Sequence, residues 1–253
     1  MAHKTLISGT AYSVTGGREL IGGTGYGCKA GKTIIGGTAF DVPFEKGLRL
    51  SNVLPGAILY LNESGSPVQF YIAKHNYEPE LNGAGRTLIV RKDCGEGKRI
   101  GISNNYAGGN ADSWNNRTWT YLLDAGVKAT LGNTKFYYTP GTGNNTVSVL
   151  SRAAFQLSAA ELGFTASTIN AEGTELPIAS MLKIAYKDGS AVFQWTRTPR
   201  TDDAKKSTTI TDEGYLASIA SNTTGFCKCR PAFTLPGTLA LAQNADGTYS
   251  LAS

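Results

Sequence analysis

The sequence predicts an α+β fold rich in β-structure, in which a short β-repeat segment precedes one globular domain. Charged residues make up only 17% of the 253 residues and Gly occurs 31 times, whereas ordinary globular chains carry about 25% charged residues. The segments that resemble strands lie at both ends of the globular part, and those that resemble helices lie between them. The 3 Trp, 12 Tyr and 9 Phe provide enough large side chains for a sizeable core.

The most regular feature is an internal repeat within residues 1–46. Three segments align without gaps at a period of 14 residues: KTLISGTAYSV from Lys4, RELIGGTGYGC from Arg18 and KTIIGGTAFDV from Lys32. Each unit has a β-favouring aliphatic pair and a Gly soon after it, and an interior Gly would cost a helix about 1 kcal/mol. Short strands with tight turns fit better, so one unit holds either two short strands or one strand and a return loop.

Such a unit cannot bury its own apolar face, so we expect the repeats to pack on another copy of the chain or on a neighbour in an assembly. Symmetry favours a homo-oligomer, with a trimer first. A β-prism, a β-solenoid and an intertwined trimer all remain open. The expected assembly residues are Leu6, Ile7, Tyr12, Leu20, Ile21, Tyr26, Ile34, Ile35 and Phe40.

Two glycine patterns in the repeats imitate nucleotide-binding motifs without their spacing. GGTGYG from Gly22 is followed by Cys28 where a dinucleotide fingerprint needs Gly. Gly31-Lys32-Thr33 lacks the Gly five residues earlier that a phosphate-binding loop requires, and it opens the third repeat. We therefore interpret both as structural repeat.

Residues 47–253 are expected to form one domain. The sequence predicts strands at Ala57–Asn62, Pro67–Ala73, Arg86–Arg91 and Val192–Arg197, and closing strands at Tyr215–Ala220 and Arg230–Leu235. Helices are predicted after an N-cap at Ser113, after a capping box at Ser158 and across Ile178–Tyr186. Strands at both ends of this domain predict that its termini lie close together.

Charge and hydropathy argue against two classes of partner. The formal charge of +5 is scattered, and its densest run, Lys205-Lys206, adjoins Asp202-Asp203, so we expect no nucleic acid to bind. No apolar run approaches the roughly 20 residues that span a bilayer, so we expect no membrane insertion. The start of the chain shows no secretion signal, which predicts synthesis in a bacterial cytoplasm and release by lysis.

Catalytic and metal-binding patterns are weak. Cys28, Cys94 and Cys227 are interpreted as small buried hydrophobes, since only His3 and His75 could complete a metal site and one residue separates Cys227 from Cys229. Glu161, Glu172 and Glu175 show no paired pattern. We therefore predict no metal, no cofactor and no enzymatic activity.

Four segments follow one another along the globular part of the chain: WNNRTWTYLLDAGV, VSVLSRAAFQLSAAELGF, FQWTRTPRTDD and CRPAFTLPGTLAL. Together they resemble a phage-associated domain of unknown function of Firmicutes and their prophages, with motifs of the W-L-R-S-P and G-V-R-P-A-L type. The GTAY and GTGY repeats are similar to those that precede this domain in phage proteins. Thr196 and Thr198 replace the Leu and Ser of the family pattern, and Cys229 replaces its Val.

The resemblance implies a C-type-lectin-like layout for the globular domain, a fold that serves both binding modules and oxidative enzymes. It implies structural roles, with Trp side chains in the core and Arg side chains holding loops. The residues that match the motifs are Trp114, Tyr121, Trp195, Arg197, Pro199, Arg230 and Pro231.

Two long polar loops are the candidate contacts for a receptor, because loops commonly carry binding residues. They lie at residues 104–116 and 198–211, and their alternative role is solvated surface or contact with a virion neighbour. The candidate binding residues are Asn104, Asn105, Tyr106, Arg200, Asp202, Asp203, Lys205 and Lys206.

The chain is therefore expected in a virion, as a non-enzymatic structural protein of a phage tail, baseplate or fibre. Its repeats would bind other virion proteins, and its domain would face a host-surface glycan or protein. A capsid decoration protein is the main alternative. A secreted carbohydrate-binding module and a depolymerase or oxidase are further ones; a depolymerase would need a carboxylate pair on a concave surface.

Overall fold

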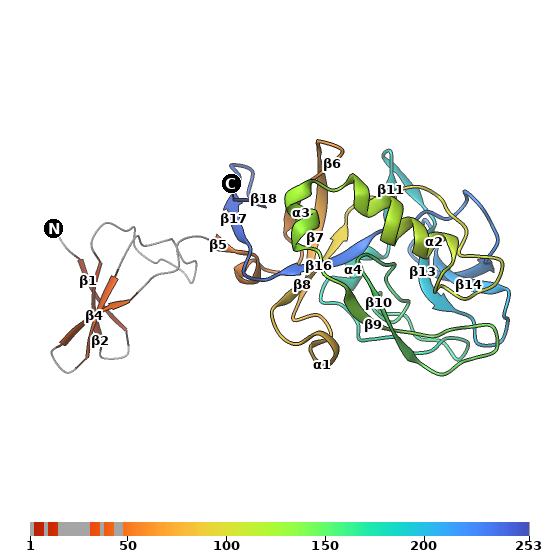
Figure 1. Cartoon of the computed structure of the whole chain (residues 1–253), viewed down its shortest axis with the longest axis horizontal. Coiled ribbons are helices and arrows are strands. Elements are labelled where there is room, and N and C mark those ends of the chain that lie inside the picture. Colours follow the sequence, from red (N-terminus) through yellow and green to blue (C-terminus); the bar gives the residue numbers. More distant parts are fainter. Residues whose placement is uncertain (1–2, 8–9, 15–30, 36–37, 43–47, 253) are drawn as a thin grey trace.

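The computed structural model describes residues 3–7, 10–14, 31–35, 38–42 and 48–252, with side chains described from residue 48 onward (Figure 1). Among these residues, no helix is both long and apolar enough to cross a membrane. The described chain is β-rich with few helical turns, which confirms the β-rich part of the predicted fold class.

Four N-terminal strands form an antiparallel sheet of their own, in the order β1 (His3–Ile7), β2 (Thr10–Val14), β3 (Gly31–Ile35) and β4 (Thr38–Val42). The first and third repeat units thus form two strands each, and β2 pairs with β3 to join them. The backbone register places Tyr12 opposite Thr33, and Thr33 opposite Phe40. Of the expected assembly residues, Leu20, Ile21 and Tyr26 lie outside the described residues.

The largest sheet has seven strands in the order β16-β8-β7-β6-β18-β17-β5. Its strands are β5 (Leu48–Arg49), β6 (Ile58–Glu63), β7 (Ser66–His75), β8 (Arg86–Arg91), β16 (Ala232–Pro236), β17 (Ala240–Gln243) and β18 (Tyr249–Leu251). The β6–β7 turn has positive φ at Ser64 and Gly65, which matches the twist of a tight hairpin.

At one side of this sheet β18 pairs with β6, and β17 pairs with β5. The beginning and end of residues 48–252 therefore lie side by side, as predicted, and Figure 1 shows the C-terminus beside β5.

Three smaller sheets accompany it: β13-β14-β15, β9-β10 and β11-β12. Their strands are β9 (Thr134–Tyr138), β10 (Ser148–Arg152), β11 (Ala185–Lys187), β12 (Ser190–Val192), β13 (Gln194–Pro199), β14 (Lys206–Ile210) and β15 (Leu216–Ala220). A single bridge between Phe155, which follows β10, and Ala232 of β16 links the β9–β10 region to the seven-stranded sheet.

The helical elements are short. They are η1 (Leu50–Asn52), α1 (Pro79–Asn82), α2 (Asn110–Ser113), the π-helical η2 (Trp114–Trp119), the 3₁₀ turn η3 (Thr120–Leu122), α3 (Ala125–Thr130) and α4 (Ala179–Leu182). Residues 110–122 form one continuous helical segment that changes its winding twice, so the N-cap predicted at Ser113 is wrong: the segment begins three residues earlier.

The helix predicted across Ile178–Tyr186 is also wrong beyond its first turn. Only Ala179–Leu182 is helical, and Ala185–Lys187 is a strand that pairs with β12 across a turn with positive φ at Asp188 and Gly189. That turn fixes a hairpin, which overrides the helical pattern. The capping box at Ser158 is present as reciprocal hydrogen bonds, because Ser158 N–H donates to Glu161 Oε2 at 2.8 Å and Glu161 N–H donates to Ser158 Oγ at 3.0 Å. The short helix predicted after it is wrong, because residues 159–163 form turns only.

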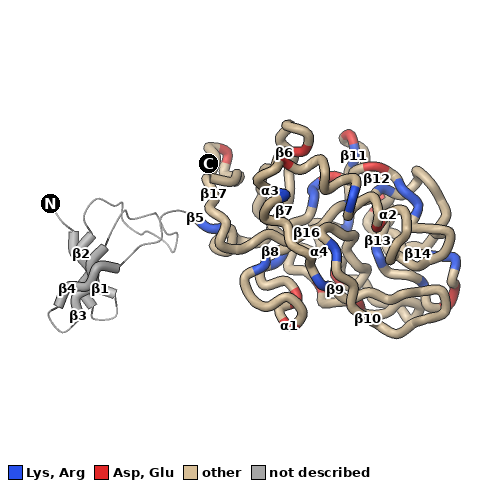
Figure 2. The backbone as a smooth tube through the Cα atoms, in the orientation of Figure 1, with Lys and Arg blue, Asp and Glu red and all other residues tan. Residues whose placement is uncertain are grey.

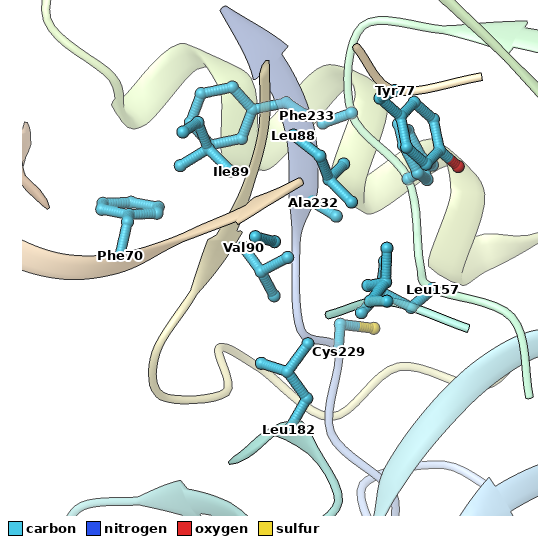
Figure 3. Packing of buried hydrophobic residues seen from close by; sticks show 14 of the residues in the cluster. Phe70, Tyr77, Leu88, Ile89, Val90, Leu157, Leu182, Cys229, Ala232 and Phe233 are labelled. Carbon is cyan, nitrogen blue, oxygen red and sulfur yellow. The ribbon is translucent and has the colours of Figure 1, made fainter. Parts of the chain in front are cut away.

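The hydrophobic core lies on the seven-stranded sheet. Phe70 of β7 and Phe233 of β16 meet edge to face at 5.7 Å between ring centroids, and Trp119 packs on Phe233 at 5.5 Å. Figure 3 shows Phe233 beside Leu88 and Ile89 of β8. A second aromatic group, with Phe155 between Phe136 and Tyr77, joins β9 to the end of β7.

Candidate functional site

The π-helical turn η2 determines how the two neighbouring tryptophans Trp114 and Trp119 are presented. Residues five apart point about 140° away from each other on an α-helix, but the wider π turn brings them towards one side. Both rings are accordingly buried, with exposed fractions of 6% and 1%. Single π turns recur at functional sites in proteins, so η2 is a candidate part of a functional site.

Trp119 forms the inner end of the site. Its indole Nε1–H donates to Glu63 Oε1 at 3.0 Å, and the Arg91 guanidinium donates two hydrogen bonds of 2.8 and 3.0 Å to the same carboxylate. A paired, fork-shaped contact of this kind fixes the orientation of both side chains. Trp119, Glu63 and Arg91 therefore form a rigid wall.

Trp114 lies against the backbone of Gly95. A Cβ placed on Gly95 would come within 2.4 Å of the indole Cη2, far inside van der Waals contact. Only glycine allows the ring to lie this close to the chain, so Gly95 sets the position of Trp114.

Two hollows open on either side of Trp114, which lines both of them, and we call them together the Trp114 groove. The first has a volume of about 330 Å³ and is lined by Lys98, Asn110, Ser113, Trp114, Arg117 and Thr118. The second has about 220 Å³, and its lining includes Glu63, Arg91, Cys94, Trp119, Lys187 and Asp188. Small-molecule sites in proteins generally measure 300–1,000 Å³, so the first hollow is large enough to hold one ligand group.

The charges of the two hollows differ. The Arg117 side chain is exposed and makes no hydrogen bond or ion pair within residues 48–252, and the Lys98 ammonium pairs only with the exposed Glu96 at 2.5 Å. The second hollow is lined by charges of both signs, with Glu63 paired to Arg91 and with Asp93, Glu96, Lys187 and Asp188 beside them. The first hollow is therefore cationic and has an arginine available for a ligand.

Residues of the sequence motifs hold the groove walls. Trp195 donates from Nε1 to the carbonyl of Lys98 at 2.6 Å, and the Arg230 guanidinium donates to the carbonyls of Arg91 and Lys92 at 2.9 and 2.7 Å. Arg152 binds the carboxylate of Asp112 at 2.8 Å and so holds α2. These side chains, of which Trp195 and Arg230 are buried and Arg152 is half-buried, position the groove and do not line the first hollow.

Arg197 organises a second polar region that is closed to solvent. Its guanidinium binds Glu161 Oε2 at 2.7 Å and also donates to the carbonyls of Tyr137, Gln156 and Glu172. Burial by itself would lower the pKa of Arg197, but the charge and hydrogen bond of Glu161, together with the charges of Tyr77 and Glu172, outweigh burial and raise that pKa. The structural role predicted for this residue agrees with these contacts.

The sequence showed no sign that Glu161 and Glu172 belong together. Glu172 accepts from Thr198 Oγ1 at 2.7 Å and from Thr139 N–H at 2.6 Å, and Tyr77 donates to Glu161. Desolvation raises the pKa of Glu172. Both carboxylates face Arg197 inside the protein and not on a concave surface, so they form an internal network.

The two predicted receptor loops do meet, but through buried contacts. Asn104 Nδ2 donates to the carbonyls of Arg200 and Asp203 at 2.9 and 3.0 Å, and Asn104 is 1% exposed. Tyr106 is fully buried, and its hydroxyl accepts from Gln156 N–H. Side chains this deep cannot contact a receptor, so the binding role predicted for Asn104 and Tyr106 is wrong: they join the loops.

The remaining loop candidates stay predictions. Arg200 forms an ion pair with Asp202, and Lys206 lies 3.5 Å from Asp203, so much of the loop charge is paired internally. Asn105 accepts from the N–H of Ala107. Lys205 is exposed. These residues do not line either hollow of the Trp114 groove.

The motif residues are buried with one exception. Trp114, Trp195, Arg197, Pro199, Arg230 and Pro231 are buried, whereas Tyr121 is 76% exposed. The change from π to 3₁₀ winding after Trp119 turns Tyr121 outwards. Trp119, which the predicted motif set omitted, takes the core position.

The three described thiols, Cys94, Cys227 and Cys229, are buried and free. Desolvation raises the pKa of Cys94 to about 11 and that of Cys227 to about 12, so these thiols stay protonated and are poor nucleophiles. Figure 3 places Cys229 among the apolar side chains of the core. The interpretation as small buried hydrophobes fits all three, and Cys28 lies outside the described residues.

Metal ligands and surface charge add two further findings. Within the described part of the chain, no group of three or more His, Cys, Asp or Glu side chains is arranged to hold a metal ion. Figure 2 shows Lys and Arg interspersed with Asp and Glu along residues 48–252. The first hollow is a local concentration of positive charge on a surface of mixed sign.

Comparison with known proteins identifies one family. No curated protein and no solved structure matches the chain significantly. The family described as "Domain of unknown function (DUF6273)" matches residues 84–237, which is more than half of the chain and includes η2, Arg197 and Arg230. The chain therefore belongs to the DUF6273 family of domains of unknown function.

Proposed function

We propose that this chain is a non-enzymatic structural protein of a bacteriophage virion, in the tail, baseplate or fibre, and that its globular domain binds the host surface through the Trp114 groove. The observation that carries the binding role is the first hollow, where a buried aromatic ring adjoins a lysine and an arginine whose side chain has no partner within residues 48–252. A hollow with few, well-placed polar groups and one apolar wall is typical of a ligand site.

Two features support a binding module rather than an enzyme. The cysteine thiols are buried, with raised pKa values, and the Glu161–Arg197–Glu172 group is enclosed at 0% side-chain exposure. Neither can meet a substrate from solution.

The N-terminal repeats supply the proposed anchor to other virion proteins and to further copies of the chain, with a trimer favoured. Units one and three form hairpins in one antiparallel sheet, whose outer strands β1 and β4 each have one side unpaired within that sheet. An unpaired strand edge can accept another strand by backbone hydrogen bonding. This geometry suits assembly by strand addition.

The proposal is tested by quantifying the chain in purified phage particles by mass spectrometry. A tail or baseplate protein should be present in a few to a few dozen copies per particle, and hundreds of copies would replace this placement with capsid decoration. Absence of the chain from particles would contradict the virion proposal and favour a secreted module or an enzyme.

The anchoring role has its own test in the full chain. Replacing Tyr12 and Phe40 by Ser should lower incorporation into particles, because both lie on one row across the sheet with Thr33. The matched control is the double change Ser13→Ala and Asp41→Ala, at the next position of the same strands. Equal incorporation of both doubles would contradict anchoring through the aromatic positions.

A further inference from the structure

We propose that the first hollow of the Trp114 groove binds an anionic sugar unit, one that carries a carboxylate or a phosphate next to its hydroxyl groups. This inference deepens the proposed function by naming the chemical class of the ligand at that site. It follows from the two positively charged side chains that line the hollow, from the polar side chains that line it with them and from the position of the Trp114 ring.

The positive charge of the hollow is available to a ligand. Arg117 has no partner within residues 48–252. A guanidinium presents a planar fork of donors that matches a carboxylate or a phosphate. No protein anion within residues 48–252 neutralises this arginine. The hollow that it lines therefore favours an anionic ligand.

Lys98 supplies a second cation. Its ammonium pairs with Glu96, but the two side chains are 36% and 63% exposed, and an exposed pair of this kind contributes only about 0–1 kcal/mol. A ligand anion can therefore replace Glu96 at low cost. The backbone of Lys98 stays fixed meanwhile, because Trp195 donates to its carbonyl.

The carboxylates near the hollow already have partners. Asp112 of α2 is 3% exposed and receives three hydrogen bonds of 2.8–3.0 Å from the guanidinium of Arg152. It also accepts from the N–H of Gly108. A ligand anion in the hollow thus competes with Glu96 for Lys98, whereas the Arg117 side chain has no partner within residues 48–252.

The other lining groups suit hydroxyls and a C–H face. Ser113 and Thr118 offer hydroxyl groups, Asn110 offers an amide, and its Oδ1 accepts from Arg99 at 3.0 Å. Trp114 contributes an apolar indole edge whose position Gly95 fixes. Short polar side chains around one aromatic ring are the groups that a single sugar ring needs for hydrogen bonding and apolar contact.

Size and charge distribution argue against larger anions. A volume of about 330 Å³ lies at the lower end of small-molecule sites, which fits one or two sugar units. Nucleic acid is bound by a row of cations along the backbone, whereas charges of both signs are interspersed along residues 48–252 (Figure 2). The unit recognised is therefore small and carries its charge at one point.

The test titrates the full-length chain with three oligosaccharide probes of similar length by calorimetry at low salt. The probes are oligogalacturonate, which carries carboxylates, oligo(glycerol phosphate) bearing sugar substituents, and a neutral galactose oligomer. We expect at least one anionic probe to bind and the neutral one to bind at least tenfold more weakly. The anionic probe that binds identifies the source as uronic acid or phosphodiester polymer.

Variants locate the binding. Arg117→Gln and Lys98→Gln should each weaken the anionic probe about 10-fold or more, since a charge-assisted hydrogen bond contributes about 1.5–3 kcal/mol. Lys128→Gln is the matched control, because Lys128 is an exposed cation on α3 outside both hollows. Unchanged melting temperatures would show that the variants fold.

Three results would overturn the inference: no binding of either anionic probe, equal binding of the neutral probe, or equal losses in Lys128→Gln and Arg117→Gln. None of them decides where the chain resides, because particle composition is measured separately. Failure of the ligand class is therefore distinguishable from failure of the virion proposal.

Discussion

The surroundings of two arginines differ in a way that separates structure from function in this domain. Arg197 is enclosed, and each of its guanidinium nitrogens donates to a protein oxygen. Arg117 lies at the rim of a hollow and has no protein partner within residues 48–252. A charge that is fully satisfied internally holds the fold, whereas an unsatisfied charge beside a fixed aromatic ring is available for binding.

The side chains around the two arginines differ in the same way. Around Arg197, Glu161 and Glu172 each accept hydrogen bonds from several donors. Around Arg117, Ser113 and Thr118 line open space. Substitutions should therefore affect stability in the first region and ligand binding in the second.

The largest expected effect is on stability, from Arg197→Met. It leaves two buried carboxylates without their cation, and breaking a buried ion pair in this way costs about 3–5 kcal/mol. Arg117→Met should stay within about 0.5 kcal/mol, as surface changes usually do. Urea unfolding followed by Trp fluorescence measures both, and similar losses in the two variants would remove the distinction between the regions.

A smaller loss is expected from Gly95→Ala, because the new methyl group would overlap the Trp114 ring at 2.4 Å. Overpacking of this kind costs about 1–3 kcal/mol, and displacement of the ring should also weaken ligand binding. Gly126→Ala is the control, since a Cβ there meets no atom within 4 Å. Fluorescence and melting unchanged by Gly95→Ala would contradict the fixed position of Trp114.

The enclosed region should also respond to pH through Glu78, near its surface end. Burial first, and then a hydrogen bond with Glu80, raise the pKa of Glu78 from 4.5 to about 7, while Lys74 lies 3.7 Å away. A raised pKa in the folded state means that protonation favours folding. This contribution is complete below about pH 4.5 and is lost as the pH rises through about 7.

Glu78→Gln should therefore raise the free energy of unfolding at pH 8 by about 1–2 kcal/mol relative to the original chain and leave it nearly equal at pH 4.5. Chemical unfolding at the two pH values measures this difference, with Glu213→Gln as an exposed control. If Glu78→Gln raised the free energy of unfolding by the same amount at pH 4.5 as at pH 8, the Glu78 carboxyl would not titrate in this range.

The smallest effect concerns the polar loop at 198–211, the alternative binding surface. Lys205→Gln should leave binding of the anionic probe unchanged within about twofold, because Lys205 lines neither hollow. The comparison is with Arg117→Gln in the same titration. A larger loss in Lys205→Gln than in Arg117→Gln would move the binding surface to this loop.

Local patterns predicted much of this fold. Alternation and turn residues located β6, β7 and β8 to within two residues, and Arg86–Arg91 matches β8 at both ends. The capping-box spacing of Ser158 and Glu161 predicted their reciprocal hydrogen bonds. Such features depend on neighbours in the sequence, which is why they can be read from it.

The site could not be predicted in the same way. Trp114 and Trp119 face one side only because the helix widens into a π turn, and nothing in WNNRTW signals that change. Glu161, Glu172 and Arg197 meet across up to 36 residues of chain. Glycine is required at position 95 because the Trp114 ring packs against its backbone. Each of these depends on tertiary contacts that periodicity does not encode.

Imaging this chain inside purified particles, at a resolution that resolves side chains, tests the central claim most directly. The account predicts residues 4–42 packed against a tail or baseplate neighbour, with the Trp114 groove facing outward and Arg117 uncovered. A virion protein seated on Lys98 and Arg117, which would make the groove an assembly contact, would contradict it.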